Sequence, residues 1–114
     1  FGGNPLVCAA ANAVLDALVE DGLIERARVL GARMLEAFRT RLAGNNRVRD
    51  IRGCGLMLGI ELADPCGTLV NEGLAAGILL NVTRDNVIRL LPPLTMSDAE
   101  ADLVVERIVG LIEA

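Results

Sequence analysis

The chain has 114 residues, of which 53% are hydrophobic, with a mean hydropathy of +0.48 and a formal net charge of −4. Two phenylalanines are its only aromatic residues and its arginines are scattered, which argues against nucleic-acid binding through a basic patch with stacking side chains. No apolar run approaches the roughly 18 residues of a membrane span, so we expect one soluble, cytoplasmic domain. Its apolar surplus indicates either a piece that packs against a larger body or partner subunit, or simply an Ala/Leu-rich domain.

Several reactive residue types are absent. All 11 basic residues are arginine, and the chain has no histidine, lysine or tyrosine. Acid–base catalysis by histidine and Schiff-base chemistry by lysine are therefore impossible within these residues alone. Cys8, Cys54 and Cys66 lack metal-ligand spacing, so we expect reduced thiols and no metal site. If the chain serves catalysis, it does so as part of a larger protein.

Two helices are predicted at the start of the chain. Asn4 suits the N-cap and Pro5 the first helical position of an Ala-rich helix that runs to about Val19. Over residues 23–42 apolar side chains recur every three or four positions, which predicts an amphipathic helix that ends near Gly44. Because the chain starts where a helix starts and has no initiator methionine, we expect a fragment.

A strand and a short helix are predicted next. Alternating apolar residues over 56–62 predict a strand with one buried face. Gly53 and Gly55 precede it and indicate either a bend or bulge, or a close approach of the backbone to a substrate. Residues 64–76 predict a helix that stops at Gly77.

The last third predicts a hairpin and a final helix. Strands are expected over 78–82 and 87–91, around the polar turn TRDN. Ser97 and Glu100 then form a capping box for the last helix. The predicted order is ααβαββα, and the fold class is α+β: a two-layer domain with helices packed on a small, largely antiparallel sheet.

Arg89 is the principal candidate for a functional side chain. It lies inside an apolar strand, and a desolvated charge costs several kcal/mol (order of magnitude) unless it is paired, so we expect an anionic partner. Val87, Arg89 and Leu91 share one strand face, which places Arg89 at a surface turned toward solvent or toward the rest of a larger protein. A guanidinium matches a carboxylate bidentately, and the partner is either a ligand or Glu61 in a structural pair.

Three stretches taken in order, FGGNPL, IRGCGLMLGIEL and LLNVTRDNVIRLLPPLTMSDAEAD, resemble the C-terminal part of class III, fold-type I aminotransferases that use pyridoxal 5′-phosphate. The resemblance covers residues 1–114. It implies that residues 1–20 are a helix leaving a large domain and that residues 21–114 are the small C-terminal domain of a homodimeric enzyme. The Schiff-base lysine would lie upstream, so we expect no catalytic residue here and an inactive fragment without bound cofactor.

The resemblance also implies substrates and binding residues. The amino group would move between N-acetylornithine and 2-oxoglutarate in arginine biosynthesis. Arg89 matches the family arginine that holds the carboxylate of 2-oxoglutarate or glutamate and can alternate to a glutamate of the large domain. Phe1, Gly2 and Gly3 would lie near the cofactor phosphate of the partner subunit, although from the residues alone they form a plain loop before a helix.

Alternatives stay open at this point. Succinylornithine or ornithine could replace N-acetylornithine, because the residues that select the amine donor lie upstream in the family. Asn81 and Thr83 match the family but have no assigned role. Outside the family, a free-standing α+β ligand-binding or interaction module using the same arginine would need neither histidine nor lysine.

Overall fold

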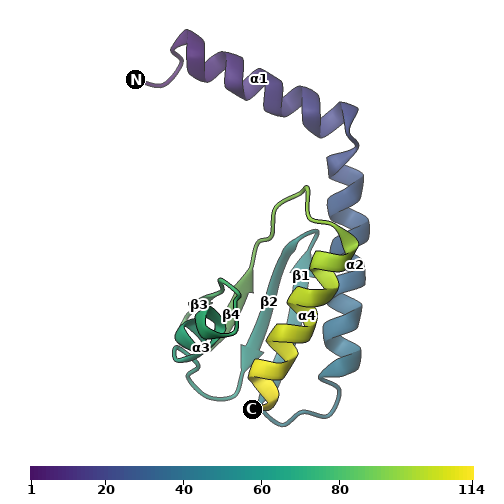
Figure 1. Ribbon diagram of the computed structural model, residues 1–114, viewed down its shortest axis with the longest axis vertical. Helices are drawn as coiled ribbons and strands as arrows, with labels where there is room; N and C mark the ends of the chain where they lie inside the picture. The colour runs from purple at the N-terminus through teal and green to yellow at the C-terminus, as the bar shows by residue number, and fades with distance from the viewer.

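The computed structural model describes all 114 residues and contains four helices and four strands (Figure 1). The elements are α1 (Pro5–Glu20), α2 (Leu23–Arg41), β1 (Val48–Cys54), β2 (Met57–Leu62), α3 (Leu69–Ala75), β3 (Asn81–Thr83), β4 (Val87–Leu90) and α4 (Asp98–Glu113). The strands form one sheet in the order β1-β2-β4-β3, and every neighbouring pair is antiparallel. The predicted α+β class, with helices on an antiparallel sheet, is confirmed.

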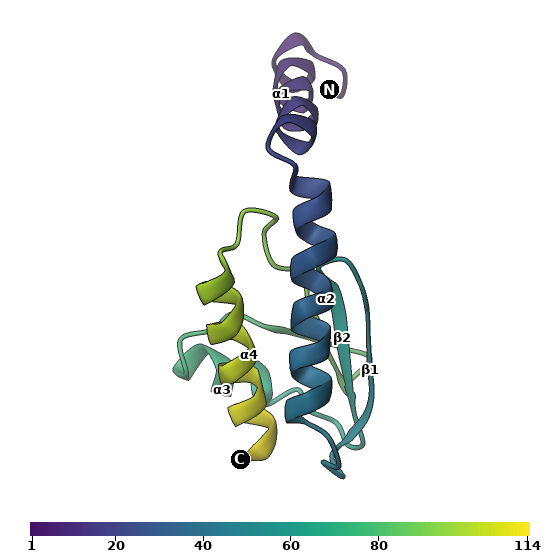
Figure 2. The same ribbon diagram turned by 90° about the vertical axis from the view of Figure 1, so that its right-hand side faces the viewer.

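The core lies between the sheet and the helices α2 and α4, which run along one of its faces (Figure 2). Its most buried large side chains come from both layers and include Phe38, Ile60, Ile88, Ile108 and Ile112. The alternating residues of β2 and β4 supply the sheet side of the core, because successive strand residues point to opposite faces. The opposite face of the sheet carries no helix.

The helix ends predicted from capping residues are confirmed. The Asn4 side chain accepts a hydrogen bond from the Val7 amide at 3.0 Å, and Pro5 occupies the first position of α1. At α4 the Ser97 hydroxyl accepts from the Glu100 amide at 3.2 Å, while the Ser97 amide donates to the Glu100 carboxylate at 2.8 Å. Each cap satisfies amides that have no partner inside the helix.

The predicted order ααβαββα is wrong by one strand, because residues 48–62 form a hairpin. β1 and β2 pair from Val48 to Leu62, and the turn lies at Gly55, whose φ is +54°. β1 is an edge strand whose side chains are mostly exposed, so the apolar alternation that revealed β2 is missing. The close backbone approach expected at the glycines exists, but the neighbour is Gly31 of α2.

Two further boundaries differ from the prediction. The helix expected over 64–76 begins only at Leu69, because the Cys66 amide donates to the carbonyl of Asp85 at 2.8 Å and ties this segment to the β3–β4 turn. The strand expected at 78–82 begins at Asn81, since the Ile78 amide still caps α3 by donating to the Gly73 carbonyl at 2.9 Å. Gly77 ends α3 with φ +76°, as predicted.

Helix α1 projects away from the rest of the domain (Figures 1 and 2). None of its residues is buried, and its packing partner is α2. Apolar side chains such as Leu6 and Val19 are exposed along it. No helix of the structure has both the length and the apolar character needed to cross a membrane.

Candidate functional site

Arg89 lies on the open face of the sheet. Ile88 and Leu90, its neighbours in β4, point into the core, whereas Arg89 and Leu91 are exposed. The predicted division of the strand into two faces is confirmed for residues 88–91, whereas Val87, predicted on the face of Arg89, is buried at 6% exposure. The premise that the Arg89 charge is desolvated is wrong, because the structure buries no charged side chain.

A row of four residues crosses the open face at the level of Arg89. The register pairs Arg52 with Gly59, Gly59 with Arg89, and Arg89 with Asn81. Gly59 has no side chain, so the protein surface is depressed at the centre of this row. A hollow of about 420 Å³ lies there. Its lining residues are Arg52, Gly53, Cys54, Met57, Leu58, Gly59, Thr83, Val87 and Arg89.

The two arginines of this row have different partners. The Nη1 atom of Arg52 lies 2.7 Å from a carboxylate oxygen of Asp50 and 2.8 Å from one of Glu61. Hydrogen bonds to Asp50 and then to Glu61 raise the pKa of the Arg52 guanidinium. The alternative that Glu61 forms a structural pair with Arg89 is therefore wrong in this structure.

Arg89 has no side-chain hydrogen bond and no ion pair within the chain. Its guanidinium donors are therefore free of partners within the chain. An arginine can offer two parallel N–H donors to one carboxylate, which makes this the strongest type of hydrogen-bonded anion contact available on the open face. The geometry therefore fits the binding of a carboxylate at Arg89.

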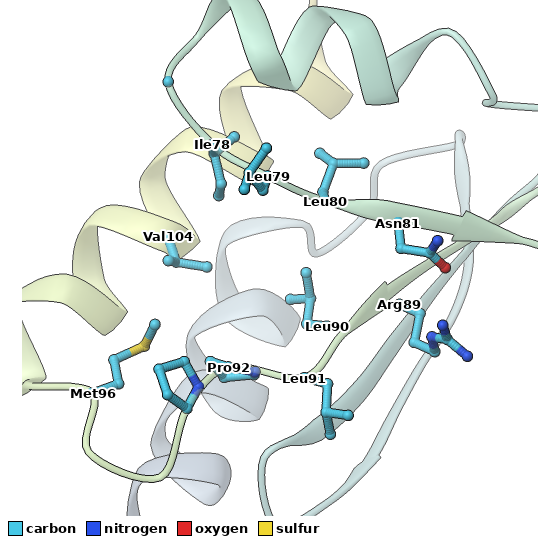
Figure 3. Close-up of a pocket in the computed structure, with 12 residues that line it drawn as sticks. Ile78, Leu79, Leu80, Asn81, Arg89, Leu90, Leu91, Pro92, Met96 and Val104 are labelled. Carbon is cyan, nitrogen blue, oxygen red and sulfur yellow. The ribbon is translucent and has the colours of Figure 1, made fainter.

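A second hollow, of about 590 Å³, borders Arg89 on its other side. It is mainly apolar and is formed by the segment before β3, by the segment after β4 and by α4. Figure 3 shows Asn81 and Arg89 beside one another at one edge, with the guanidinium directed away from the apolar side chains. Arg89 therefore lies at the rim of this hollow, with its guanidinium turned away from the apolar lining.

Most residues of this second hollow were not anticipated as site residues. Leu79, Leu91, Pro93, Met96 and Val104 line it and come from three separate segments of the chain. The pair Pro92-Pro93 is the local signal available in the sequence, because two prolines directly after a strand force the chain out of the sheet. The convergence of the other residues depends on how α4 packs.

The glycine loop before α1 is not part of this site within one chain. Phe1, Gly2 and Gly3 are exposed and lie at the far end of the projecting α1, away from the sheet (Figure 1). Asn4 already accepts from the Val7 amide, and its side-chain nitrogen donates to the Phe1 carbonyl at 2.9 Å. Gly3 adopts φ +80°, a conformation that glycine favours.

The cysteines form no disulfide. Cys8 and Cys54 are exposed, and Cys66 is buried. Burial raises the pKa of the Cys66 thiol, so this sulfur is a poor nucleophile near neutral pH. Cys54 lies in the hollow above Gly59.

Comparisons with known proteins cover nearly the whole chain. The family model described as aminotransferase class-III matches residues 1–112. The chain is 51% identical over 113 residues to acetylornithine aminotransferase 1 of Bordetella pertussis, covering 99% of this chain and 29% of that protein. It is 48% identical over 112 residues to acetylornithine aminotransferase of Nitrosomonas europaea, covering 98% of this chain and 28% of that protein.

Solved structures agree with these sequence matches. The ornithine aminotransferase of Plasmodium yoelii superposes with a TM-score of 0.92 at 31% identity, over 98% of this chain and 31% of that one. The chain thus spans less than a third of the length of the relatives it matches.

Proposed function

The chain belongs to the class-III aminotransferase family, and on this basis we propose that it is part of an aminotransferase acting on N-acetylornithine and 2-oxoglutarate. This reaction would place the full-length enzyme in arginine biosynthesis. The support is the high identity to acetylornithine aminotransferases along almost the whole chain. The observation that supports a substrate-binding role for this segment is the Arg89 guanidinium, which is exposed and has no partner within the chain.

In this proposal Arg89 binds the carboxylate of 2-oxoglutarate or glutamate through two parallel hydrogen bonds. Asn81 stands directly opposite Arg89 in the sheet, and its amide can add a donor at the same edge. The apolar hollow beside them accommodates aliphatic carbons of a bound substrate. Arg89 therefore binds and orients one substrate, while the chemical step is carried out by residues outside this chain.

The family implies dependence on pyridoxal 5′-phosphate, and the residues present here fit only the edge of such a site. None of the 114 residues is a lysine, so none can bind this cofactor covalently. Phe1, Gly2 and Gly3 are exposed just before a helix N-terminus and are candidates for contact near the cofactor phosphate of a partner subunit. When bound, the cofactor supplies the carbanion stabilisation.

The domain assignment follows the same proposal. Residues 1–20 form a helix that belongs against a large domain, and residues 21–114 form the small C-terminal domain. The support is that α1 contributes nothing to the core formed by the other elements. We further propose a cytoplasmic homodimer in which the loop before α1 approaches the partner subunit, and an inactive isolated fragment.

The test of the carboxylate role is Arg89→Lys in the full-length protein. Lysine keeps the charge but loses the planar pair of donors, so the half-reaction with 2-oxoglutarate should lose about 1.5–3 kcal/mol of transition-state stabilisation. This corresponds to a decrease in kcat/KM of about 10- to 150-fold. Arg41→Lys, at an exposed arginine near the end of α2, is the matched control and should leave this value unchanged. Near-normal kinetics of Arg89→Lys would contradict the assignment.

The amine donor is tested separately. Rates of the half-reaction with N-acetylornithine, succinylornithine and ornithine should rank N-acetylornithine first. A clear preference for ornithine would move the protein to the ornithine aminotransferases, which this chain also resembles. Neither result would affect the role of Arg89 toward 2-oxoglutarate.

A further inference from the structure

Glu61 is placed within reach of two arginines. It lies two residues after Gly59 on the same face of β2, while Arg52 and Arg89 stand directly opposite Gly59 on the two flanking strands. Both arginines are therefore diagonal neighbours of Glu61. Diagonal neighbours in antiparallel strands lie about 7–8 Å apart, which long side chains can span. Glu61 can thus pair with either arginine.

The structure shows only one of these two pairs. The Glu61 carboxylate accepts from Arg52 at 2.8 Å, and the same Arg52 nitrogen donates to Asp50 at 2.7 Å. Asp50 and Glu61 together hold the Arg52 side chain at the β1 edge of the hollow. Arg89, on the β4 side, is left without an anionic partner. The open face holds two carboxylates and two arginines, yet only one arginine is neutralised.

We propose that Arg52 is a positioning residue for carboxylate binding at Arg89, because it holds Glu61 away from the Arg89 guanidinium. This inference rests on the proposed function of Arg89. A carboxylate on the neighbouring strand competes with a bound substrate for the same donors, and it does so at a fixed, high effective concentration. Arg52 removes this competitor without itself contacting the substrate.

The expected size of the effect follows from the strength of exposed ion pairs. If Glu61 is released and pairs with Arg89 as an ordinary surface pair, the fraction of free Arg89 falls and the half-saturating concentration of substrate rises in proportion. The half-saturating concentration of 2-oxoglutarate should therefore increase about two- to six-fold. The limiting rate should change little, because the bound complex is the same once the substrate has displaced Glu61.

The test uses the full-length enzyme and its half-reaction with 2-oxoglutarate. Arg52→Met should raise the half-saturating concentration about two- to six-fold with an almost unchanged limiting rate. Adding Glu61→Gln to Arg52→Met should restore the wild-type value, since the competing carboxylate is gone. Adding Asp50→Asn instead gives the same net charge but leaves Glu61 free, so the value should stay raised.

This matched pair of double variants separates a specific competition from a general change in local charge. The proposal would be overturned if both double variants regained the wild-type half-saturating concentration, or if neither did. Glu61→Gln alone supplies a measurement that does not depend on the folding of the Arg52 variants. It should leave the half-saturating concentration unchanged, and a several-fold decrease would show that Glu61 already occupies Arg89 in the presence of Arg52.

The outcome also distinguishes this inference from the proposed function. If Arg89→Lys behaves normally, the carboxylate role of Arg89 fails and the positioning role falls with it. If Arg89→Lys is impaired but Arg52→Met binds 2-oxoglutarate normally, only the positioning role fails.

Discussion

Gly31 of α2 and Gly55 of the β1–β2 turn are in direct backbone contact, because a Cβ atom built on Gly31 would overlap the carbonyl group of Gly55. The contact lets the helix lie against the end of the hairpin. That hairpin carries Arg52 and Glu61, so the approach of two glycines also fixes the β1 side of the hollow beside Arg89.

Gly31→Ala is expected to destabilise the domain. The added methyl group meets backbone atoms, which move less readily than a side chain, and overpacking of this kind costs about 1–3 kcal/mol. The melting temperature of the full-length protein should fall. Gly110→Ala is the matched control in α4, where a Cβ meets nothing within 4 Å, and it should stabilise the helix by about 0.5–1 kcal/mol. A harmless Gly31→Ala would mean that α2 can shift away from the hairpin.

Ser97→Ala should also lower the melting temperature. The substitution removes the hydroxyl that accepts from the Glu100 amide and so exposes one end of α4, a helix that supplies Ala101, Val105 and Ile108 to the core. Loss of an N-cap costs about 0.5–2 kcal/mol. Ser97→Asp, which keeps an acceptor, should retain most of the stability. Equal melting temperatures for the wild type and Ser97→Ala would show that the cap contributes nothing.

Much of the fold could be predicted because its signals are local. Caps, prolines and glycines mark the ends of α1, α4 and α3 by their own hydrogen bonding and backbone preferences. β1 was not predicted, because only Val48 and Ile51 of this edge strand are partly buried and its sequence has no apolar alternation. Its existence depends on pairing with β2, which is not a local property.

The site was predictable in part for the same reason. Alternation along β4 places Arg89 on the face opposite Ile88, but it does not say what covers that face. The Arg89 side chain was therefore predicted to be buried, whereas the structure exposes it to solvent. The pairing of Glu61 with Arg52 depends on the register of the hairpin, and once the β1–β2 turn was missed this pairing could not be anticipated.

The domain should lose stability in acid partly through Asp98. The Arg26 hydrogen bond, together with the charges of Arg26 and Arg33, holds the pKa of this carboxyl below its usual value of 3.8. A carboxyl whose pKa is lower in the folded state than in the unfolded state stabilises the fold fully above about pH 4, and this contribution is lost as the pH falls through the folded-state pKa. Melting temperatures measured from pH 6 down to about pH 3 should therefore fall less steeply for Asp98→Asn than for the wild type.

Asp64→Asn is the control for this pH series. Asp64 is exposed and has no hydrogen-bond partner, so its removal should leave the slope unchanged. An acid slope that is the same for wild type and Asp98→Asn would indicate that the ion pairs between α2 and α4 do not contribute to stability.

Helix α1 is the part of the chain whose environment should differ most between the isolated segment and the whole protein. Before Glu20 its only polar side chains within the helix are Asn12 and Asp16, and apolar residues are exposed on every side. A helix that is apolar all round is normally buried. In the isolated 114-residue chain, amide hydrogens of α1 should exchange rapidly while those of α2 and α4 are protected, because only the latter pack into the core.

In the full-length protein the same α1 amides should become protected, since the proposed large domain covers this helix. Hydrogen exchange followed by mass spectrometry on both proteins measures the change directly. Peptides from α4, which is in the core of both, provide the internal reference. Rapid exchange of α1 in the full-length protein would contradict the assignment of residues 1–20 to the large-domain contact. Strong protection of α1 in the isolated chain would instead mean that its packing on α2 is sufficient to hold it.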